Sequence, residues 1–264
     1  MNVKMPVLFI GHGSPMNIIF DNDYTRSLAA LGRSLPKPKA ILVVSAHWLT
    51  KATSVTCTDK PKTIHDFYGF PDELYAMRYP SPGAPHEARL VTEMIKSVKV
   101  FCGEWGLDHA SWAVLKHIYP SADIPVFEMS LAYTYNEWHP KPTQYHYDLA
   151  RELSGLRDQG VLIIGSGNIV HNLGMLDFEN IDAPIFDWAG EFDERVKKSL
   201  IEGDHDALIH YRTLGRTSLL AVPTLDHYLP MIYTIALQGK NETLTFTHEG
   251  FQYGSVSMRC FQIG

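Results

Sequence analysis

Four histidines stand at the ends of hydrophobic segments of this chain, and together they could hold a metal ion. Three of them come at or soon after the end of short, continuous apolar runs, which are typical of buried parallel strands. Parallel strands bring their carboxyl ends to one edge of a sheet, where ligands and catalytic groups gather. Imidazole is the commonest protein ligand for borderline divalent metals. The three are His12, His47 and His171, and the fourth, His227, opens a segment that we predict to be helical.

Small residues beside two of these histidines leave room for a ligand. Gly11 and Gly13 flank His12, so the backbone can turn tightly next to the ring. Before His171, the segment 165–167 reads Gly-Ser-Gly and could instead form a phosphate-binding nest, although it lacks the lysine of a P-loop. A metal-binding or catalytic histidine and an anion site are therefore both open at this strand end.

Asp226 and His227 compete for one place in the site. Pro223 and Thr224 provide stop and cap signals for a helix that would begin beside them. Adjacent residues on a helix point about 100° apart, so only one of the two can be a direct ligand. We favour His227, with Asp226 either supporting it or replacing it as the ligand.

Two further segments combine histidine with aromatic residues. Asp108 is predicted to cap a helix, either as a purely structural cap or with His109 facing a pocket. The segment 63–71, which contains His65, is either an aromatic loop that covers a flat ring or a surface loop packed by its own side chains. The other histidines are interpreted as structural or exposed: His86, His117, His139, His146, His205, His210 and His248.

The elements that must position these residues alternate between strands and helices. This alternation predicts an α/β fold in which a mostly parallel central sheet is flanked by helices and followed by an antiparallel C-terminal extension. No linker, low-complexity tract or repeat divides the chain, so residues 1–264 are predicted to form a single domain. The predicted strands are 6–11, 40–46, 53–58, 98–102, 125–131, 161–166, 243–248 and 253–262, and the predicted helices are 22–34, 84–97, 110–118, 140–158, 186–202 and 225–238, with 59–83 as a loop.

Composition narrows the partners and the compartment. A formal net charge of −6 argues against nucleic acid or an anionic membrane as the main partner, and no apolar run is long enough to cross a bilayer. Residues 1–4 lead straight into a strand without a signal-peptide layout. Cys57, Cys102 and Cys260 are few, odd in number and far apart, so we expect neither a disulfide framework nor a thiolate metal site. We predict a cytoplasmic protein.

Six motifs occur together and in order, at 11–15, 45–48, 65–71, 108–109, 167–172 and 226–230, and give the chain a specific resemblance from its first predicted strand to its last. It resembles the 4,5-DOPA dioxygenase extradiol family, within the class III (LigB-type) extradiol ring-cleavage dioxygenases. The resemblance implies an α/β fold, one non-haem divalent metal and insertion of O2 into a catechol such as L-DOPA, beside its two hydroxyls.

The resemblance also implies a role for each histidine of the site. His171 matches an acid/base group or a fourth metal neighbour, His109 matches a second pocket histidine, and the loop with His65 would bind the substrate by closing over its ring. Fe(II) is expected for ring cleavage, because Zn²⁺ has no accessible redox step, although three histidines also suit Zn²⁺. The residues that match the family's metal ligands are His12, His47 and His227.

Two departures from the family pattern keep other functions open. Ala110 stands where the family usually has glycine, which is expected to narrow the pocket, and Asp226 stands where relatives often carry glutamate. A zinc hydrolase with His171 as its base, or a non-catalytic binding protein of the same fold, are the alternatives. The binding protein would lose some cleft histidines, and all are present here. The expected partners are a catechol and O2, with the chain a monomer or a small homo-oligomer.

Overall fold

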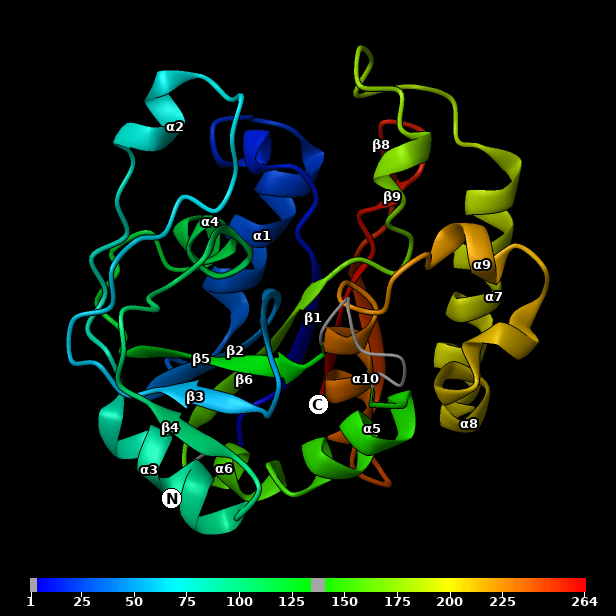
Figure 1. Ribbon diagram of the computed structural model, residues 1–264. Helices are drawn as coiled ribbons and strands as arrows, with labels where there is room; N and C mark the ends of the chain where they lie inside the picture. Colours follow the sequence, from blue (N-terminus) through cyan, green and yellow to red (C-terminus); the bar gives the residue numbers. More distant parts are fainter. Residues whose placement is uncertain (1–3, 134–140) are drawn as a thin grey trace.

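An eight-stranded sheet is the centre of this computed structural model, which describes residues 4–133 and 141–264 (Figure 1). Its strands are β1 (Val7–Gly11), β2 (Ala40–Thr50), β3 (Ser54–Thr56), β4 (Lys99–Phe101), β5 (Val126–Ala132), β6 (Val161–Gly167), β7 (Leu244–His248) and β10 (Cys260–Ile263). They lie in the order β4-β3-β5-β2-β6-β1-β10-β7. The central pairs β5-β2, β2-β6 and β6-β1 are parallel, whereas β10 runs antiparallel to both β1 and β7. The predicted α/β class and the antiparallel C-terminal extension are confirmed.

Helices cover both faces of the sheet (Figure 1). One layer contains α1 (Asp23–Ser34) and α4 (His109–Ile118), and the opposite layer contains α3 (Pro85–Met94), α5 (Thr143–Arg151), α6 (Ser154–Asp158) and α10 (Leu229–Ala236). Three more helices pack beside α10: α7 (Asp187–Glu202), α8 (His205–Ile209) and α9 (Ser218–Ala221). Within the described ranges, no helix has both the length and the apolar character that crossing a bilayer requires.

The side chains of β2 show why its sequence is continuously apolar. Ile41 and Val43 pack in the core under α1 and α4, while Leu42 and Val44 pack in the core on the α5 and α10 side. All four are buried. A strand covered by helices on both faces needs apolar residues at successive positions, and the same pattern predicted this strand from the sequence.

Several predicted boundaries were wrong, mostly where short turns interrupt a longer element. The helix predicted over 140–158 is two helices, because i→i+3 hydrogen bonds tighten the chain around Glu152; its first residue and His139 lie outside the described residues. The predicted loop 59–83 contains α2 (Asp72–Ala76). The strand predicted over 253–262 divides into β8 (Phe251–Gln252), β9 (Val256–Ser257) and β10, because Gly254 turns the chain with a φ of 75°.

A single disulfide joins Cys57 to Cys102; the sequence argued against a disulfide framework and did not predict this pairing. Strands β3 and β4 pair in parallel, with Thr56 opposite Phe101. The residues that directly follow the two strands, Cys57 and Cys102, therefore lie side by side. Their Cα atoms are 5.1 Å apart across a sequence separation of 45 residues. Cys260 is free and buried. Long-range strand pairing, which spacing along the chain does not reveal, brings the two sulfurs together.

Candidate metal centre

Three histidines from distant parts of the chain converge at the carboxyl ends of the central strands. His12 follows β1, His47 lies in β2, and His227 lies in the turn that leads into α10. Each offers one nitrogen, and these nitrogens lie within 4.8 Å of one another. The ring centroids are 5.0–5.3 Å apart. This group matches the ligand set that the sequence resemblance implied.

His47 reaches the group because β2 is irregular at this point. The strand continues to Thr50 rather than ending at residue 46 as predicted, and its pairing register with β5 shifts between Val44 and Leu49. The backbone N–H of His47 lies 3.1 Å from the Ser45 hydroxyl, which accepts its hydrogen bond. Such an irregularity re-aims a side chain out of the regular alternation, and it is common beside active sites.

His227 precedes its helix instead of opening it. The predicted helix 225–238 begins at Leu229, because Asp226 and His227 form the turn before it and Pro230 occupies the first helical turn. The carbonyl of His227 accepts a hydrogen bond of 2.9 Å from the backbone N–H of Asn168, just after β6. This bond ties the third histidine to the same sheet edge as the other two.

Carboxylates hold two of the three imidazoles by their Nδ1 atoms. His47 Nδ1 lies 2.9 Å from Asp66 Oδ2, and His227 Nδ1 lies 2.5 Å from Asp226 Oδ2. A carboxylate accepts hydrogen bonds, so each Nδ1 carries the proton and each Nε2 keeps a free lone pair. Asp226 therefore supports His227 rather than taking its place in this geometry.

A hydroxyl does the same for His12. Ser166 Oγ donates a hydrogen bond of 2.6 Å to the carbonyl of Ala110, so it must act as acceptor toward His12 Nδ1, 3.1 Å away. His12 Nε2 and His47 Nε2 then face each other at 3.3 Å as two acceptors. A shared cation satisfies such a pair, so the donor set fits a divalent metal held by three neutral imidazoles.

Burial keeps most of this centre neutral. It lowers the pKa of His12 well below its ordinary value, with the neighbouring histidines adding to the effect, and it lowers the pKa of His227. Burial also disfavours charge on His47, but the Asp66 hydrogen bond and the charge of Asp108 outweigh it and raise the pKa of His47. Neutral imidazoles beside ionised carboxylates give the site a negative electrostatic potential, which favours a cation.

Asp66 also holds a fourth histidine. Its Oδ2 accepts a hydrogen bond of 2.9 Å from His109 Nδ1, and its Oδ1 accepts one of 2.8 Å from the backbone N–H of His109. Burial lowers the pKa of His109 to about 4, so its Nε2 is a free acceptor near neutral pH. Asp66 was not predicted to have a role. Its position in an aromatic loop, directly after His65, is the sequence feature that could have indicated a role in the site.

The placement of His109 also answers the question about Asp108. The Asp108 side chain accepts a hydrogen bond from the backbone N–H of Ser111 and caps α4. His109 lines the large cavity of the site, which has a volume of about 960 Å³. Of the two alternatives drawn from the sequence, the structure has the one in which His109 faces a pocket. Ala110 is fully buried and is not among the described residues that line the cavity, so the expected narrowing of the pocket was wrong.

His171 stacks on His227 instead of joining the three-histidine group. Their rings are nearly parallel, at 7°, with centroids 3.5 Å apart. Among the described residues, the clusters with metal-ligand spacing do not include His171. Its backbone N–H donates to the carbonyl of Ala221, and that of Asn168 donates to His227, so this strand end does not present these groups to a phosphate.

His65 lies beside the cavity wall rather than on it. Its Nε2 lies 3.1 Å from the carbonyl oxygen of Met77, and its ring packs edge-on against Trp112 with centroids 5.5 Å apart. The next residues, Asp66 and Phe67, line the cavity, whereas His65 is not among its described lining residues. The predicted aromatic loop is present, and its contact with the cavity comes from these neighbours.

The metal centre opens into a cavity of about 960 Å³. Besides the histidines, its lining comes mainly from three segments, 13–16, 66–70 and 172–178. Most of these side chains are apolar or aromatic. The apolar and aromatic lining residues are Pro15, Met16, Ala46, Leu49, Phe67, Tyr68, Phe70, Leu173, Leu176, Phe178, Pro223, Tyr253 and Val256.

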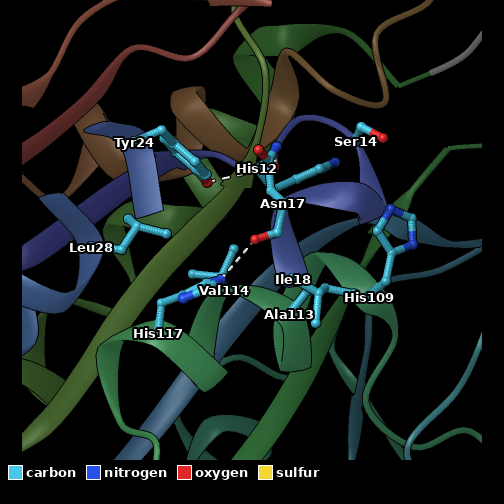
Figure 2. Close-up of a pocket in the computed structure, with 10 residues that line it drawn as sticks. All are labelled: His12, Ser14, Asn17, Ile18, Tyr24, Leu28, His109, Ala113, Val114 and His117. Atoms are coloured by element: carbon cyan, nitrogen blue, oxygen red, sulfur yellow. Dashed lines mark hydrogen bonds between the residues drawn. The ribbon is translucent and has the colours of Figure 1, made fainter. Parts of the chain in front are cut away.

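A second cavity, of about 10 Å³, lies between the metal centre and α1 (Figure 2). Its volume suits roughly one water molecule. Figure 2 shows Asn17 and Tyr24 beside His12, whose carbonyl accepts hydrogen bonds from the Asn17 amide at 3.3 Å and the Tyr24 hydroxyl at 3.5 Å. His117 Nε2 lies 2.9 Å from the Asn17 carbonyl oxygen. These contacts hold the backbone of His12 from behind.

Comparisons with known proteins agree on one family. Residues 6–256 match the family described as the catalytic LigB subunit of aromatic ring-opening dioxygenase. The chain is 42% identical to 4,5-DOPA dioxygenase extradiol of Escherichia coli K12, over 100% of this chain and 96% of that protein, and 36% identical to 4,5-DOPA dioxygenase extradiol of Beta vulgaris, over 97% and 95%. A crystal structure of an uncharacterized Escherichia coli K12 protein superposes with a TM-score of 0.84 at 38% identity, covering 98% of this chain and 100% of the other.

Proposed function

Because this chain belongs to the LigB family of aromatic ring-opening dioxygenases, we propose that it cleaves a catechol such as L-DOPA beside its two hydroxyls, with O2 as co-substrate. The observation that carries this proposal is the set of three imidazoles whose Nδ1 atoms are all engaged and whose Nε2 atoms converge below a large cavity. A bound metal would keep coordination positions free for substrate, because the described part of the chain brings three histidine ligands to it.

The three histidines would hold one divalent ion, and we expect Fe(II). When bound, Fe(II) supplies the electron transfer between a chelated catechol and O2 that Zn²⁺ cannot supply. The protein's own contribution is placement: His12, His47 and His227 hold the ion, and the aromatic segment 66–70 covers the ring. Excluding water there strengthens the electrostatic interactions of the site.

Two other histidines would move protons. Burial lowers the pKa of His171 well below its ordinary value, so its ring is neutral and can accept a phenolic proton. We assign proton transfer to His171, which lines the cavity, and a supporting role to His109, whose Nε2 lone pair is oriented by Asp66. The imidazolium formed by that transfer can return the same proton later in the reaction, and the ring is then neutral again.

Reconstitution of the whole protein with Fe(II) tests the function. Addition of L-DOPA and then air to anaerobically loaded enzyme should give a yellow ring-opened product and one equivalent of O2 uptake per product. A zinc hydrolase on the same histidines would consume no O2, so zinc-loaded protein is the matched control. Absence of O2 uptake with a panel of catechols would reject ring cleavage.

Replacement of His171 separates proton transfer from metal binding. We expect His171→Ala to retain the metal and to lose turnover by about 10²–10⁴-fold, the usual contribution of a general acid/base. Metal content by elemental analysis and kcat with a catechol provide the two measurements. His86→Ala is the control, because the His86 side chain is 71% exposed and lies on α3, on the far side of the fold. Full activity in His171→Ala would refute this assignment.

A further inference from the structure

The lining of the large cavity indicates which catechols fit it best. We propose that the preferred substrate is a catechol whose ring substituent is uncharged, apolar and larger than the amino-acid side chain of L-DOPA; this inference rests on the ring-cleavage function proposed above. Three features of the cavity carry it: its charge, the arrangement of its aromatic residues, and its size with its exposed mouth.

The charged side chains of the lining do not favour an anionic substituent. In the described ranges 4–133 and 141–264, the lining contains no lysine or arginine, and its acidic residues are Asp66 and Asp226. Those carboxylates lie against His47, His109 and His227. A carboxylate on a substituent that extends away from the metal would lose hydration in this cavity without gaining a lysine or arginine partner from the described lining, and leaving a charge unpaired in this way is costly.

An aromatic wall leads outward from the catalytic histidines. The Phe67 ring packs edge-on against His109, with centroids 5.6 Å apart, and against Phe70, with centroids 5.3 Å apart. Both phenylalanines line the cavity. A flat catechol ring held beside His109 would therefore extend its substituent along aromatic carbon, which favours apolar groups.

The size and the mouth of the cavity fit a substituent of some bulk. A volume of about 960 Å³ lies at the upper end of the range for sites that enclose a whole drug-sized ligand. Three apolar lining residues remain largely exposed: Tyr68 at 91%, Phe178 at 69% and Leu173 at 56%. Exposed apolar residues on the lining of a cavity commonly mark a binding surface, and an apolar substituent that reaches them would cover them.

Matched substrates test the proposal directly. The probes are 3-(3,4-dihydroxyphenyl)propanoate, its methyl ester and its hexyl ester, which share one catechol ring and differ in charge and length. On the Fe(II)-loaded enzyme we expect kcat/KM to rise about tenfold from the acid to the methyl ester, and to rise again with the hexyl ester. L-DOPA should be turned over no better than the acid.

Each other outcome has a distinct meaning. Equal or faster turnover of the acid, or of L-DOPA, than of the esters would overturn the substrate class while leaving ring cleavage intact. No gain from the methyl to the hexyl ester would overturn the size argument. Failure of every catechol to support O2 uptake would instead reject the proposed function.

A charge introduced at the mouth should reverse the preference. We expect Leu173→Arg to raise kcat/KM for the acid about tenfold relative to the methyl ester, because the cation gives the carboxylate a partner. Leu219→Arg is the matched control, because Leu219 is 61% exposed and lies on α9, outside the described lining. The acid-to-ester ratio of kcat/KM in this variant should stay at the wild-type value. An unchanged acid-to-ester ratio in Leu173→Arg would count against the proposal.

Discussion

Each imidazole of the metal centre has a partner on Nδ1 that decides which nitrogen carries the proton. Asp66, Asp226 and Ser166 are those partners, and each turns an Nε2 lone pair toward the common point. Residues that orient metal-bound histidines in this way usually affect metal affinity by about 10–100-fold. The ligand set is therefore only part of the site; its outer hydrogen bonds determine its geometry.

Asp66 should be the most sensitive of these partners, because one carboxylate orients both His47 and His109. We expect Asp66→Asn to weaken metal binding by about 10–100-fold and to reduce turnover further, since an amide cannot provide two anionic contacts. Competition with a chromophoric chelator measures the affinity. Asp123→Asn, which removes an exposed partner of Lys37, is the control. Wild-type affinity in Asp66→Asn would contradict the shared-carboxylate geometry.

The losses of metal affinity in two variants can show whether Asp226 or His227 is the third metal ligand. If His227 binds the metal, His227→Ala should lose nearly all metal, whereas Asp226→Asn should weaken binding by about 10–100-fold. Isothermal titration of each variant with Zn²⁺ gives the comparison without relying on activity. The reverse order, with Asp226→Asn the more damaging change, would make the carboxylate the ligand.

At the scale of elements, the site depends on how closely α10 and the turn before it approach β6. A Cβ atom on Gly165 would overlap the carbonyl oxygen of Pro230, and one on Gly167 would overlap the carbonyl oxygen of His227. Glycine in the strand lets the two backbones touch. The turn that carries His227 is thus held against the end of β6, beside the strand that His12 follows.

Gly167→Ala should push the turn with His227 away from β6. We expect a loss of about 1–3 kcal/mol in the free energy of unfolding, as for other overpacked sites, together with weaker metal binding. Thermal unfolding with and without Zn²⁺ measures both effects. Gly155→Ala is the control, because its added Cβ would meet only the end of the Met94 side chain at 3.4 Å. Equal metal-induced stabilisation in both variants would argue against this coupling.

At the scale of the whole molecule, one buried arginine on α6 connects the N-terminal segment before β1 with the segment between α10 and β7 through hydrogen bonds. Arg157 donates to the carbonyl of Met5 at 2.7 Å and to the carbonyl of Leu237 at 2.8 Å, and it forms a bidentate pair with Glu242 at 2.7 and 2.8 Å. Its side chain is 1% exposed. Losing one partner of such a buried pair is costly, because the remaining charge is left without compensation.

This pair predicts how stability changes with pH. The Glu242 carboxyl loses hydration, but Arg157 and Lys4 outweigh that effect and lower its pKa to about 2 from an ordinary value of 4.5. Its contribution is therefore fully present above about pH 4.5 and is lost as the pH falls toward 2. Glu242→Gln should cost about 1–3 kcal/mol at pH 7, and this difference should shrink in acid. A urea series at several pH values tests this, and a difference independent of pH would contradict it.

The sequence determined those features that depend on neighbours along the chain. Continuous apolar runs predicted the buried parallel strands, and their ends predicted where His12 and His171 would lie. Asp108 was predicted as a helix cap because capping involves residues within one turn. The order of six motifs was enough for the family, since motif order is a property of the chain itself.

Tertiary structure decided the rest, because it depends on pairings between residues far apart in the chain. The shared contacts of Asp66 with His47 and His109, the irregular register of β2 against β5, and the disulfide between Cys57 and Cys102 all join segments that sequence spacing does not connect. His171 stacks on His227 and His65 lies behind the cavity wall for the same reason. Sequence periodicity determines which face of an element is buried; packing between elements determines which side chains meet.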